Sequence, residues 1–383
     1  MILSALAEEL NISDTMYDRA VQSYSNLGEY LKKSNTDWMV EVYPQGSFEM
    51  GTVVKPLSDE EQYDVDLIVL IKKPMLEAKA LRGEVTSLLE QYGRYEGKLE
   101  DKRRCVRIQY SDSAQFHMDI ACAREHLAQS ENVILISQHD NNGNYDFSPS
   151  NPSDYVAWFK EAMRYSDLPE IRALFGKAAG ETDVKPLPLI KVHTTLQKAI
   201  QLLKRHRDIY FKDNSKNGPS SIIITTLCAL SYDYIVKNQM QSDSIYETIK
   251  SMLENFNRFI TVKDGDYHLD NPVLNGENFL TNWKDDGSLK RDFDAWIDKA
   301  TRDIIIDPAN FIENNPSKLS KELSEGFGEG VSTRALNKYG QTMGALNEAG
   351  IIKIDTSTMS STLQQSGENI KTPQKNTFFG DEA

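Results

Sequence analysis

Two aspartates, Asp64 and Asp66, are separated by one residue at the start of an apolar run that continues to Ile71. Successive side chains of a β-strand point to opposite faces of the sheet, so a strand here places both carboxylates on one face and Val65 on the other. Carboxylates on one rigid face offer the hard oxygen ligands that Mg²⁺ prefers, together with substrate phosphates. The spacing therefore predicts a magnesium site.

A Gly-Ser pair, Gly46 and Ser47, precedes this strand. We expect Ser47 at the start of a helix, where its hydroxyl and the unpaired backbone N–H groups can bind a phosphate. Capping of the helix by Ser47 uses the same N–H groups, so the two roles do not exclude each other. Gln45 is expected to support this loop or to contact a nucleotide. A phosphate site beside a metal site is typical of phosphoryl or nucleotidyl transfer.

A third carboxylate, Asp119, lies in a second alternating segment, 115–121, and shares its face with His117. A charged residue in such an apolar run is unusual unless it is paired or bound to a metal. Three carboxylates on neighbouring strands can hold two Mg²⁺ ions roughly 3.5–4 Å apart, with Mn²⁺ as an alternative ion. Asp119 could instead pair with Arg107, and His117 is expected to be a hydrogen-bonded structural residue.

The pattern of apolar residues predicts the elements that hold these side chains. Helical spacing covers 13–33 and 77–92, and a turn-rich stretch at 139–144 predicts a hairpin or loop. Alternation predicts strands over 38–43, 105–110 and 115–121.

The second half of the chain is predicted to be mainly helical, with its longest helices over 192–210 and 221–237. We expect an α/β (α+β) fold, in which a mixed twisted sheet flanked by helices occupies residues 1–150. A mainly helical lobe would follow over 151–354, with the active site in the cleft between the lobes. Residues 355–383 are rich in Ser, Thr, Gln, Asn and Lys, and we expect them to be disordered.

Bulk composition indicates a cytoplasmic protein that does not cross a membrane. No uninterrupted apolar run of the 383 residues approaches the ~20 that a membrane span needs. The first ten residues lack the basic region of a secretory signal, and the three cysteines form no CxxC pair. The net charge of −14 disfavours long nucleic acid as a partner. Basic clusters at 102–107 and 204–207 could still bind nucleotide phosphates.

The Gly-Ser turn, the Asp-x-Asp strand and the lone strand aspartate together resemble the signature of polymerase-β-like nucleotidyltransferases. Within that superfamily the chain resembles bacterial relatives of cyclic GMP-AMP synthase, which make cyclic oligonucleotide second messengers in anti-phage defence. The Gly-Ser-Phe-x-x-Gly-Thr form, with a Pro-containing insert before Asp-Val-Asp, is most similar to the dinucleotide cyclase branch. Supporting blocks lie at 196–208, 219–227 and, more weakly, 271–279, so the resemblance covers residues 40 to 290.

The resemblance implies further phosphate ligands in the helical lobe. In the family, a lysine on the first long helix and a serine early in the next helix contact the donor triphosphate, and the matching positions are Lys204 and either Ser220 or Ser221. An ammonium group is a suitable point-charge partner for phosphates. Alternatively, Lys204 belongs to a solvated helix face. Arg205 and Arg207 are expected at the surface or in pairs between the lobes.

The implied activity joins nucleoside triphosphates, with ATP and GTP favoured, into a cyclic di- or trinucleotide and releases pyrophosphate. Asp64, Asp66 and Asp119 would hold the metals, and Asp119 would take or orient the proton of the attacking ribose hydroxyl. The product would act on a downstream effector. A ubiquitin-transfer-like accessory enzyme could conjugate the C-terminal tail. Cyclisation rests on the resemblance alone.

Two other classes of function remain open from the sequence. The first is another nucleotidyltransferase, such as a linear oligoadenylate synthase, a tRNA nucleotidyltransferase, or an enzyme that modifies a protein or an antibiotic. A tRNA enzyme is disfavoured by the acidic net charge. The second is an inactive nucleotide sensor, which is disfavoured because all three carboxylates and the Gly-Ser turn are present.

Overall fold

A mixed seven-stranded sheet forms the N-terminal half of the chain in the computed structural model. Its main path runs β1-β2-β5-β4-β3, and β6 and β7 extend it from β5. β2 and β5 are parallel, whereas the other neighbouring pairs are antiparallel. The strands are β1 Met39–Pro44, β2 Tyr63–Lys72, β3 Leu99–Asp101, β4 Val106–Gln109, β5 Phe116–Glu125, β6 Ile134–His139 and β7 Tyr145–Ser150.

The structure describes most of the chain, namely residues 1–34, 38–58, 61–72, 76–110, 115–127, 132–164, 184–188, 193–240, 244–284, 287–304, 316–351, 353–355, 360–362 and 370–371. Three short strands near the C-terminus form a separate sheet, and they are β10 Lys353–Asp355, β11 Ser360–Thr362 and β12 Ile370–Lys371. Most of the tail 355–383 lies outside the described residues, so its disorder stays a prediction.

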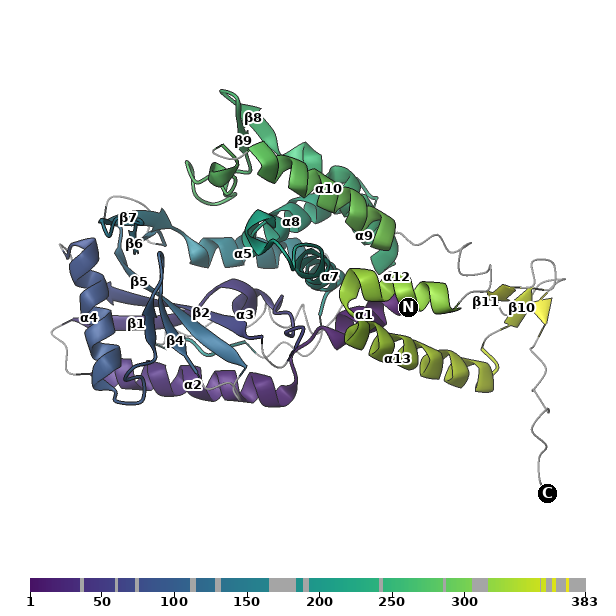
Figure 1. The fold of residues 1–383 in the computed structure, drawn as a ribbon, viewed down its shortest axis with the longest axis horizontal. Helices are drawn as coiled ribbons and strands as arrows, with labels where there is room; N and C mark the ends of the chain where they lie inside the picture. The colour runs from purple at the N-terminus through teal and green to yellow at the C-terminus, as the bar shows by residue number, and fades with distance from the viewer. Residues whose placement is uncertain are drawn as a thin grey trace, which may run out of the picture.

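Helices α2 (Asp14–Lys33) and α4 (Ala78–Gln91) pack on one face of the sheet (Figure 1). The side chain of Ser13 accepts a hydrogen bond from the Met16 amide and caps α2. The odd-numbered residues of β2, from Val65 to Ile71, are fully buried against these helices. The even-numbered residues, including both aspartates, therefore point to the opposite face. The period-2 pattern of the sequence predicted this division.

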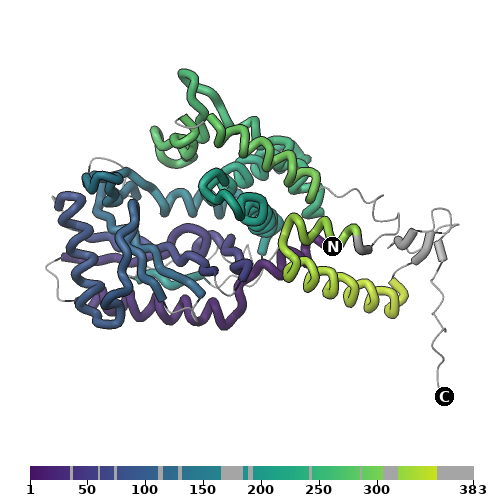
Figure 2. The backbone as a smooth tube through the Cα atoms, in the orientation of Figure 1, coloured from purple at the N-terminus to yellow at the C-terminus, as the bar shows by residue number. Residues whose placement is uncertain are grey.

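A second core gathers most of the remaining helices into a helical lobe. Its N-terminal member, α1, packs against α13 and α7 rather than on the sheet (Figure 2). These helices are α1 Ile2–Glu9, α5 Pro152–Met163, α7 Thr195–Tyr210, α8 Ser221–Lys237, α9 Ile245–Phe259, α10 Gly287–Ile304, α12 Pro316–Phe327 and α13 Glu329–Glu348. A hairpin and two 3₁₀ helices complete it, at β8 Thr261–Lys263, β9 Asp266–His268, η2 Ser215–Asn217 and η3 Thr281–Trp283. The domain boundaries at 150/151 and 354/355 stay predictions.

Most of the elements expected from the sequence are present. The predicted helices 13–33, 77–92 and 221–237 appear as α2, α4 and α8, and the stretch 139–144 lies in the hairpin between β6 and β7. The helix expected over 192–210 begins at Thr195, where Thr194 and Gln197 form a capping box.

One segment of the described chain, Ser215–Lys237, has the length and hydropathy that could span a membrane. Of its most apolar window, 61% is buried inside the protein. The segment includes α8, which packs against α9, α7 and α5. Its position in the core of the helical lobe accounts for its apolar composition.

Helix α7 joins the two lobes through polar side chains on one of its faces. Gln197 donates to the carbonyl of Met50 at 2.8 Å, and Gln201 donates to that of Val53 at 2.7 Å. Lys204 and Arg205 continue this row, and they donate to the carbonyls of Thr52 and Lys55. All four side chains are buried. The spacing of three or four residues keeps them on one side of the helix, which we call the α7 donor row.

Replacing Gln201 by leucine tests the donor row. The Gln201→Leu variant leaves the Val53 carbonyl without its donor, and we expect it to lower the free energy of unfolding by about 1–3 kcal/mol. Urea unfolding followed by circular dichroism measures the change. Lys198→Ala on the same helix is the control and should change stability much less. Equal midpoints for the two variants would contradict a structural role for the row.

Candidate active site

The Gly-Ser turn lies directly against Asp66. A short helix, α3 (Gly46–Met50), follows β1, and the amide of Gln45 donates to the carbonyl of Asp66 at 2.9 Å. Gly46 has a φ of +64°, and a Cβ at this position would lie 2.5 Å from Oδ2 of Asp66. Glycine is therefore needed for both the backbone conformation and the space. Ser47 is the second residue of α3 and is half-buried.

The parallel pairing of β2 and β5 brings the three predicted carboxylates together. Asp66 lies opposite Asp119 in the register, and Asp64 lies opposite His117. All four side chains are on the sheet face that α2 and α4 leave uncovered. The Asp64 side chain is 55% exposed and that of Asp119 is 14% exposed, so the group extends from solvent into the interior.

Arg107 pairs with Asp119, which the sequence analysis gave as the alternative to metal binding by Asp119. It lies on β4 opposite Asp119 and donates from Nε at 2.7 Å and from Nη2 at 2.8 Å. Such a bidentate pair fixes the orientation of the carboxylate. A carboxylate has about four lone-pair sites, so this pairing leaves Asp119 able to bind a metal as well. His117 contacts Asp64 through Nε2, and its Nδ1 lies 3.2 Å from Oε1 of Gln62.

The carboxylates differ strongly in their electrostatic surroundings. Burial raises the pKa of Asp66 to about 8, and the charges of Asp64 and Asp119 add to this effect. Burial also acts to raise the pKa of Asp64, but the hydrogen bond and charge of His117, with Arg107 and Lys204, outweigh it and lower the pKa. Asp66 is thus a buried acid beside two others, which is a common arrangement at functional sites.

The donor set fits a divalent cation. Asp64, His117 and Asp119 each offer a ligand atom, and these atoms lie within 4.8 Å of one another. Asp66 adds a carboxylate beside them, and the charges of Lys204 and Arg107 do not outweigh the effect of burial and of the two neighbouring acids on its pKa. A bound cation would add positive charge and favour ionisation. Carboxylate oxygens with one imidazole suit a hard or borderline divalent ion.

The three predicted residues of the helical lobe lie in different surroundings. Lys204 is 4% exposed, and its Nζ contacts the carbonyl and hydroxyl of Thr52 at 3.2 and 3.1 Å. Burial lowers its pKa to about 8, with a further contribution from Arg207. The alternative of a solvated helix face is therefore wrong for Lys204. Ser220 and Ser221 are exposed at the start of α8, where Ser221 accepts from Arg207 at 3.2 Å.

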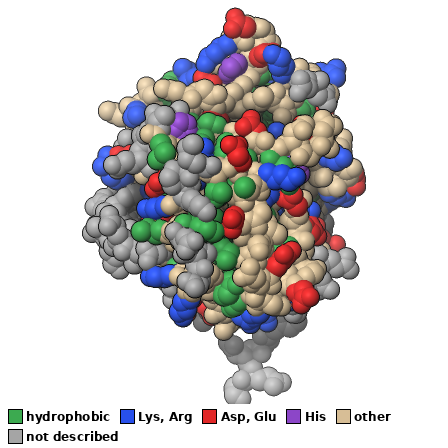
Figure 3. Space-filling model, turned by 90° about the vertical axis from the view of Figure 1, so that its left-hand side faces the viewer, with side chains coloured by type: hydrophobic (Ala, Val, Ile, Leu, Met, Phe, Trp, Pro, Cys, Tyr) green, Lys and Arg blue, Asp and Glu red, His purple; other side chains and the backbone are tan. Residues whose placement is uncertain are grey.

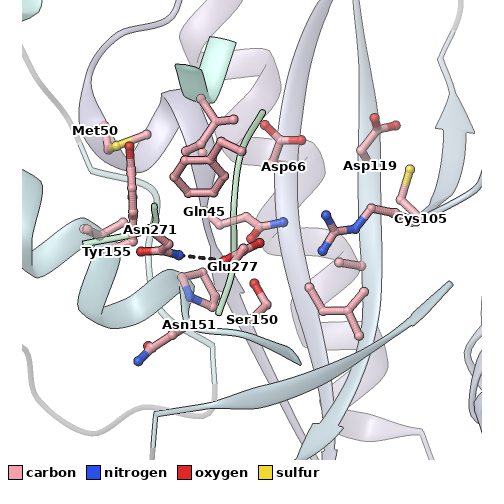
Figure 4. Close-up of a pocket in the computed structure, with 18 residues that line it drawn as sticks. Gln45, Met50, Asp66, Cys105, Asp119, Ser150, Asn151, Tyr155, Asn271 and Glu277 are labelled. Atoms are coloured by element: carbon pink, nitrogen blue, oxygen red, sulfur yellow. Dashed lines mark hydrogen bonds between the residues drawn. The ribbon is translucent and has the colours of Figure 1, made fainter. Parts of the chain in front are cut away.

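A pocket of about 410 Å³ opens beside Asp66 and Asp119, between the two lobes (Figure 4). Of the predicted residues, Gln45 and Gly46 also line it. Ser47, Asp64, Lys204, Ser220 and Ser221 are not among its lining residues. The volume is in the range of small-molecule sites.

Several lining residues were not predicted as site residues. Tyr155 and Phe279 supply aromatic walls, and Asn271 and Glu277 contribute polar groups from the loop 271–279. That loop was noted in the sequence only as a weak resemblance. Cys105 also lines the pocket, but burial raises the pKa of its thiol to about 12, so it is poorly suited to act as a nucleophile.

A mixed sheet with paired carboxylate strands beside a Gly-Ser helix is the fold of polymerase-β-like nucleotidyltransferases. The chain aligns with the *Bradyrhizobium diazoefficiens* CD-NTase CdnG in complex with GTP at a TM-score of 0.67, with 19% identity, covering 89% of this chain and 98% of that one. The *Vibrio cholerae* cyclic AMP-GMP synthase DncV, in complex with a linear intermediate, aligns at 0.55 with 15% identity, covering 87% and 80%.

Residues 40–122 match the family described as cyclic GMP-AMP synthase DncV-like, nucleotidyltransferase domain. The chain is thus a nucleotidyltransferase, and its similarity to the DncV-like family model covers residues 40–122. It is 28% identical to a c-di-GMP synthase of *Roseivirga ehrenbergii* over 99% of its length and 96% of that protein. It is also 24% identical to the cyclic dinucleotide synthase CdnG of *B. diazoefficiens*, over 58% of its length and 56% of that protein.

Substitution of Gly46 tests the contact between the turn and Asp66. Gly46→Ala forces a strained backbone and a clash with the carboxylate of Asp66. We expect pyrophosphate release to fall by ~10–100-fold, because the clash displaces this carboxylate or the turn. Gly83→Ala is a matched control, since a Cβ at Gly83 in α4 meets no atom within 4 Å. The interpretation fails if both variants retain full activity.

The raised pKa of Asp66 predicts how stability depends on pH without metal. An unfolded aspartate has a pKa near 3.9, so from pH 4 to 8 this residue is ionised in the unfolded chain while Asp66 of the folded protein stays protonated. The free energy of unfolding therefore falls progressively over this range. We expect Asp66→Asn to be more stable than the wild type above pH 8, by about 1–3 kcal/mol after allowing for coupling among the acids, and equal to it near pH 4. Urea unfolding in EDTA measures this difference.

Asp64→Asn is the control, and it should change the free energy of unfolding in the opposite direction. The pKa of Asp64 is lowered in the folded protein, so its ionised form is stabilising at neutral pH, and its removal should destabilise the protein there. A loss of stability in Asp66→Asn above pH 8 would contradict the electrostatic description.

Proposed function

We propose that this chain joins nucleoside triphosphates into a cyclic dinucleotide in a Mg²⁺-dependent reaction that releases pyrophosphate. The observation that carries the proposal is the convergence of Asp64, Asp66 and Asp119 on the open face of the sheet, beside Gly46 and a pocket large enough for a nucleotide. The activities named for the *R. ehrenbergii* and *B. diazoefficiens* relatives support cyclic dinucleotide synthesis.

The proposal gives each residue of the site a role that its surroundings support. Asp64, Asp66 and Asp119 are the proposed metal ligands, and Arg107 holds Asp119 in a fixed orientation. Bound Mg²⁺ would lower the pKa of the attacking ribose hydroxyl and neutralise charge on the triphosphate. Asp119 is the proposed group that takes or orients the hydroxyl proton.

The phosphates of the donor are proposed to lie along Ser47 and Lys204. Ser47 offers its hydroxyl next to the amides at the start of α3. Lys204 has three donor hydrogens, of which its two contacts with Thr52 leave one for a phosphate oxygen. Ser220 or Ser221 would complete the contacts from the start of α8, with Gln45 supporting the loop.

GTP is the proposed substrate at one or both positions, with ATP as the other candidate. A c-di-GMP synthase is among the relatives, and the aligned CdnG structure contains GTP. We further propose that the product is a second messenger for a downstream effector in cytoplasmic anti-phage signalling. Conjugation of the tail 355–383 by a ubiquitin-transfer-like enzyme stays a proposal, because most of that tail lies outside the described residues.

A linear oligonucleotide synthase is the alternative function, since the same carboxylates would serve both reactions. A tRNA enzyme is less favoured. Figure 3 shows acidic and basic side chains interspersed on one face of the molecule, and the net charge of the chain is −14. A broad basic surface is the usual feature of proteins that bind long nucleic acids.

Product analysis tests the proposed function. The purified protein is incubated with Mg²⁺ and the four nucleoside triphosphates labelled at the α-phosphate, and the products are treated with phosphatase and resolved by mass. We expect a phosphatase-resistant cyclic dinucleotide, lost in EDTA and reduced at least ~100-fold in Asp66→Asn and Asp119→Asn.

The control is Asp146→Asn, a change on the exposed side of β7, which should leave the yield unchanged. Linear products with free ends would instead support the oligoadenylate-type alternative. Product formation that persists in EDTA would contradict the metal dependence.

A further inference from the structure

The loop 271–279 forms one wall of the pocket, contributed by the helical lobe (Figure 4). Its ends are joined by a hydrogen bond from the amide of Asn271 to the carbonyl of Glu277 at 2.8 Å. The Asn278 side chain accepts from the amides of Leu269 and Leu280 at 3.0 and 2.9 Å. A loop held by its own hydrogen bonds can present a side chain in a defined position.

Glu277 is the carboxylate that this wall presents to the pocket. Its Oε2 accepts from Nδ2 of Asn271 at 2.7 Å, and Oδ1 of Asn271 accepts from the amide of Val273 at 2.9 Å. Asn271 is buried, so the chain Val273–Asn271–Glu277 fixes the orientation of the carboxylate. Within the described part of the chain, Oε1 of Glu277 has no hydrogen-bond donor and the carboxylate has no basic partner.

A half-buried carboxylate in a pocket is stabilised when a ligand supplies donors to it. The surrounding walls indicate which kind of ligand fits. The rings of Tyr155 and Phe279 lie 6.2 Å apart and nearly perpendicular, and both face the pocket together with Val156 and Ile222. The hydroxyl of Tyr155 is bonded to Thr226 at 2.7 Å, so Tyr155 contributes an apolar ring. Flat apolar walls beside a polar group suit a nucleobase.

We propose that Glu277 selects guanine as the base that binds in this pocket; the inference rests on the proposed function. Guanine carries two adjacent donors, N1–H and the exocyclic amino group, on its Watson–Crick edge. The two oxygens of one carboxylate accept both. Adenine carries an acceptor at N1, which would face the carboxylate without a shared hydrogen.

Replacing Glu277 by glutamine turns one of the two acceptors that face the base into a donor. A glutamine amide offers one donor and one acceptor, which match N1 and the amino group of adenine. We expect Glu277→Gln to lower the preference for GTP over ATP by roughly 10–100-fold, the range of one bidentate base contact. In an equimolar mixture, adenosine content should rise in the products of the variant.

Asp270→Asn is the matched control. It removes a carboxylate from the same region, but Asp270 is exposed and pairs with Lys263 and His268 rather than lining the pocket. The GTP preference of this variant should equal that of the wild type. Glu277→Gln overturns the proposal if it lowers the use of GTP and ATP by the same factor, or if it leaves the preference unchanged.

A binding experiment separates this inference from the proposed function. Calorimetric titration of the intact protein with non-hydrolysable GTP and ATP analogues, with Mg²⁺, reports base preference without requiring any product. A wild-type preference for the GTP analogue that is reduced in Glu277→Gln supports the role of Glu277, even if no cyclic dinucleotide forms. Equal binding of the two analogues by the wild type would overturn it, whatever product is made.

Discussion

The contact between α7 and the backbone of residues 50–55 is the interaction on which the site depends. This stretch of backbone follows α3 and has no strand partner, so its carbonyls need donors from elsewhere. The α7 donor row supplies them from the helical lobe at Met50, Thr52, Val53 and Lys55. Leaving buried carbonyls unpaired is costly, so the α7 donor row fixes the position of the helical lobe relative to this stretch of backbone.

The position of α3 follows from the same contact. Its C-terminal end is held by α7, whereas its N-terminal end lies against Asp66, where the Gln45 amide bonds to β2. The turn therefore has little freedom to move relative to the carboxylates. Asp119 is fixed independently by Arg107 on the neighbouring strand. The Gly-Ser turn and the carboxylates are thus positioned by different contacts that meet at one face of the sheet.

The grouping of carboxylates on one face of the sheet could be predicted from the sequence, whereas the contacts between the two lobes could not. Alternation alone placed Asp64 and Asp66 on one face, because β2 has a fixed period and one fully buried side. The cluster 204–207 was harder to interpret, since a helix of basic residues normally faces solvent. Lys204 and Arg205 are buried here because their partners are backbone carbonyls some 150 residues earlier in the chain. Glu277 was missed for a similar reason, since its loop reaches the pocket only through the fold.

The pocket is assembled from parts of the chain that can vary separately. The acidic residues belong to strands whose packing restricts every neighbouring position, whereas the loop 271–279 is attached to the other lobe and bonds mainly to itself. Mutations in that loop can therefore alter which ligand is accepted without disturbing the reactive centre. An enzyme with this arrangement can change its ligand preference during evolution while its acidic residues stay the same.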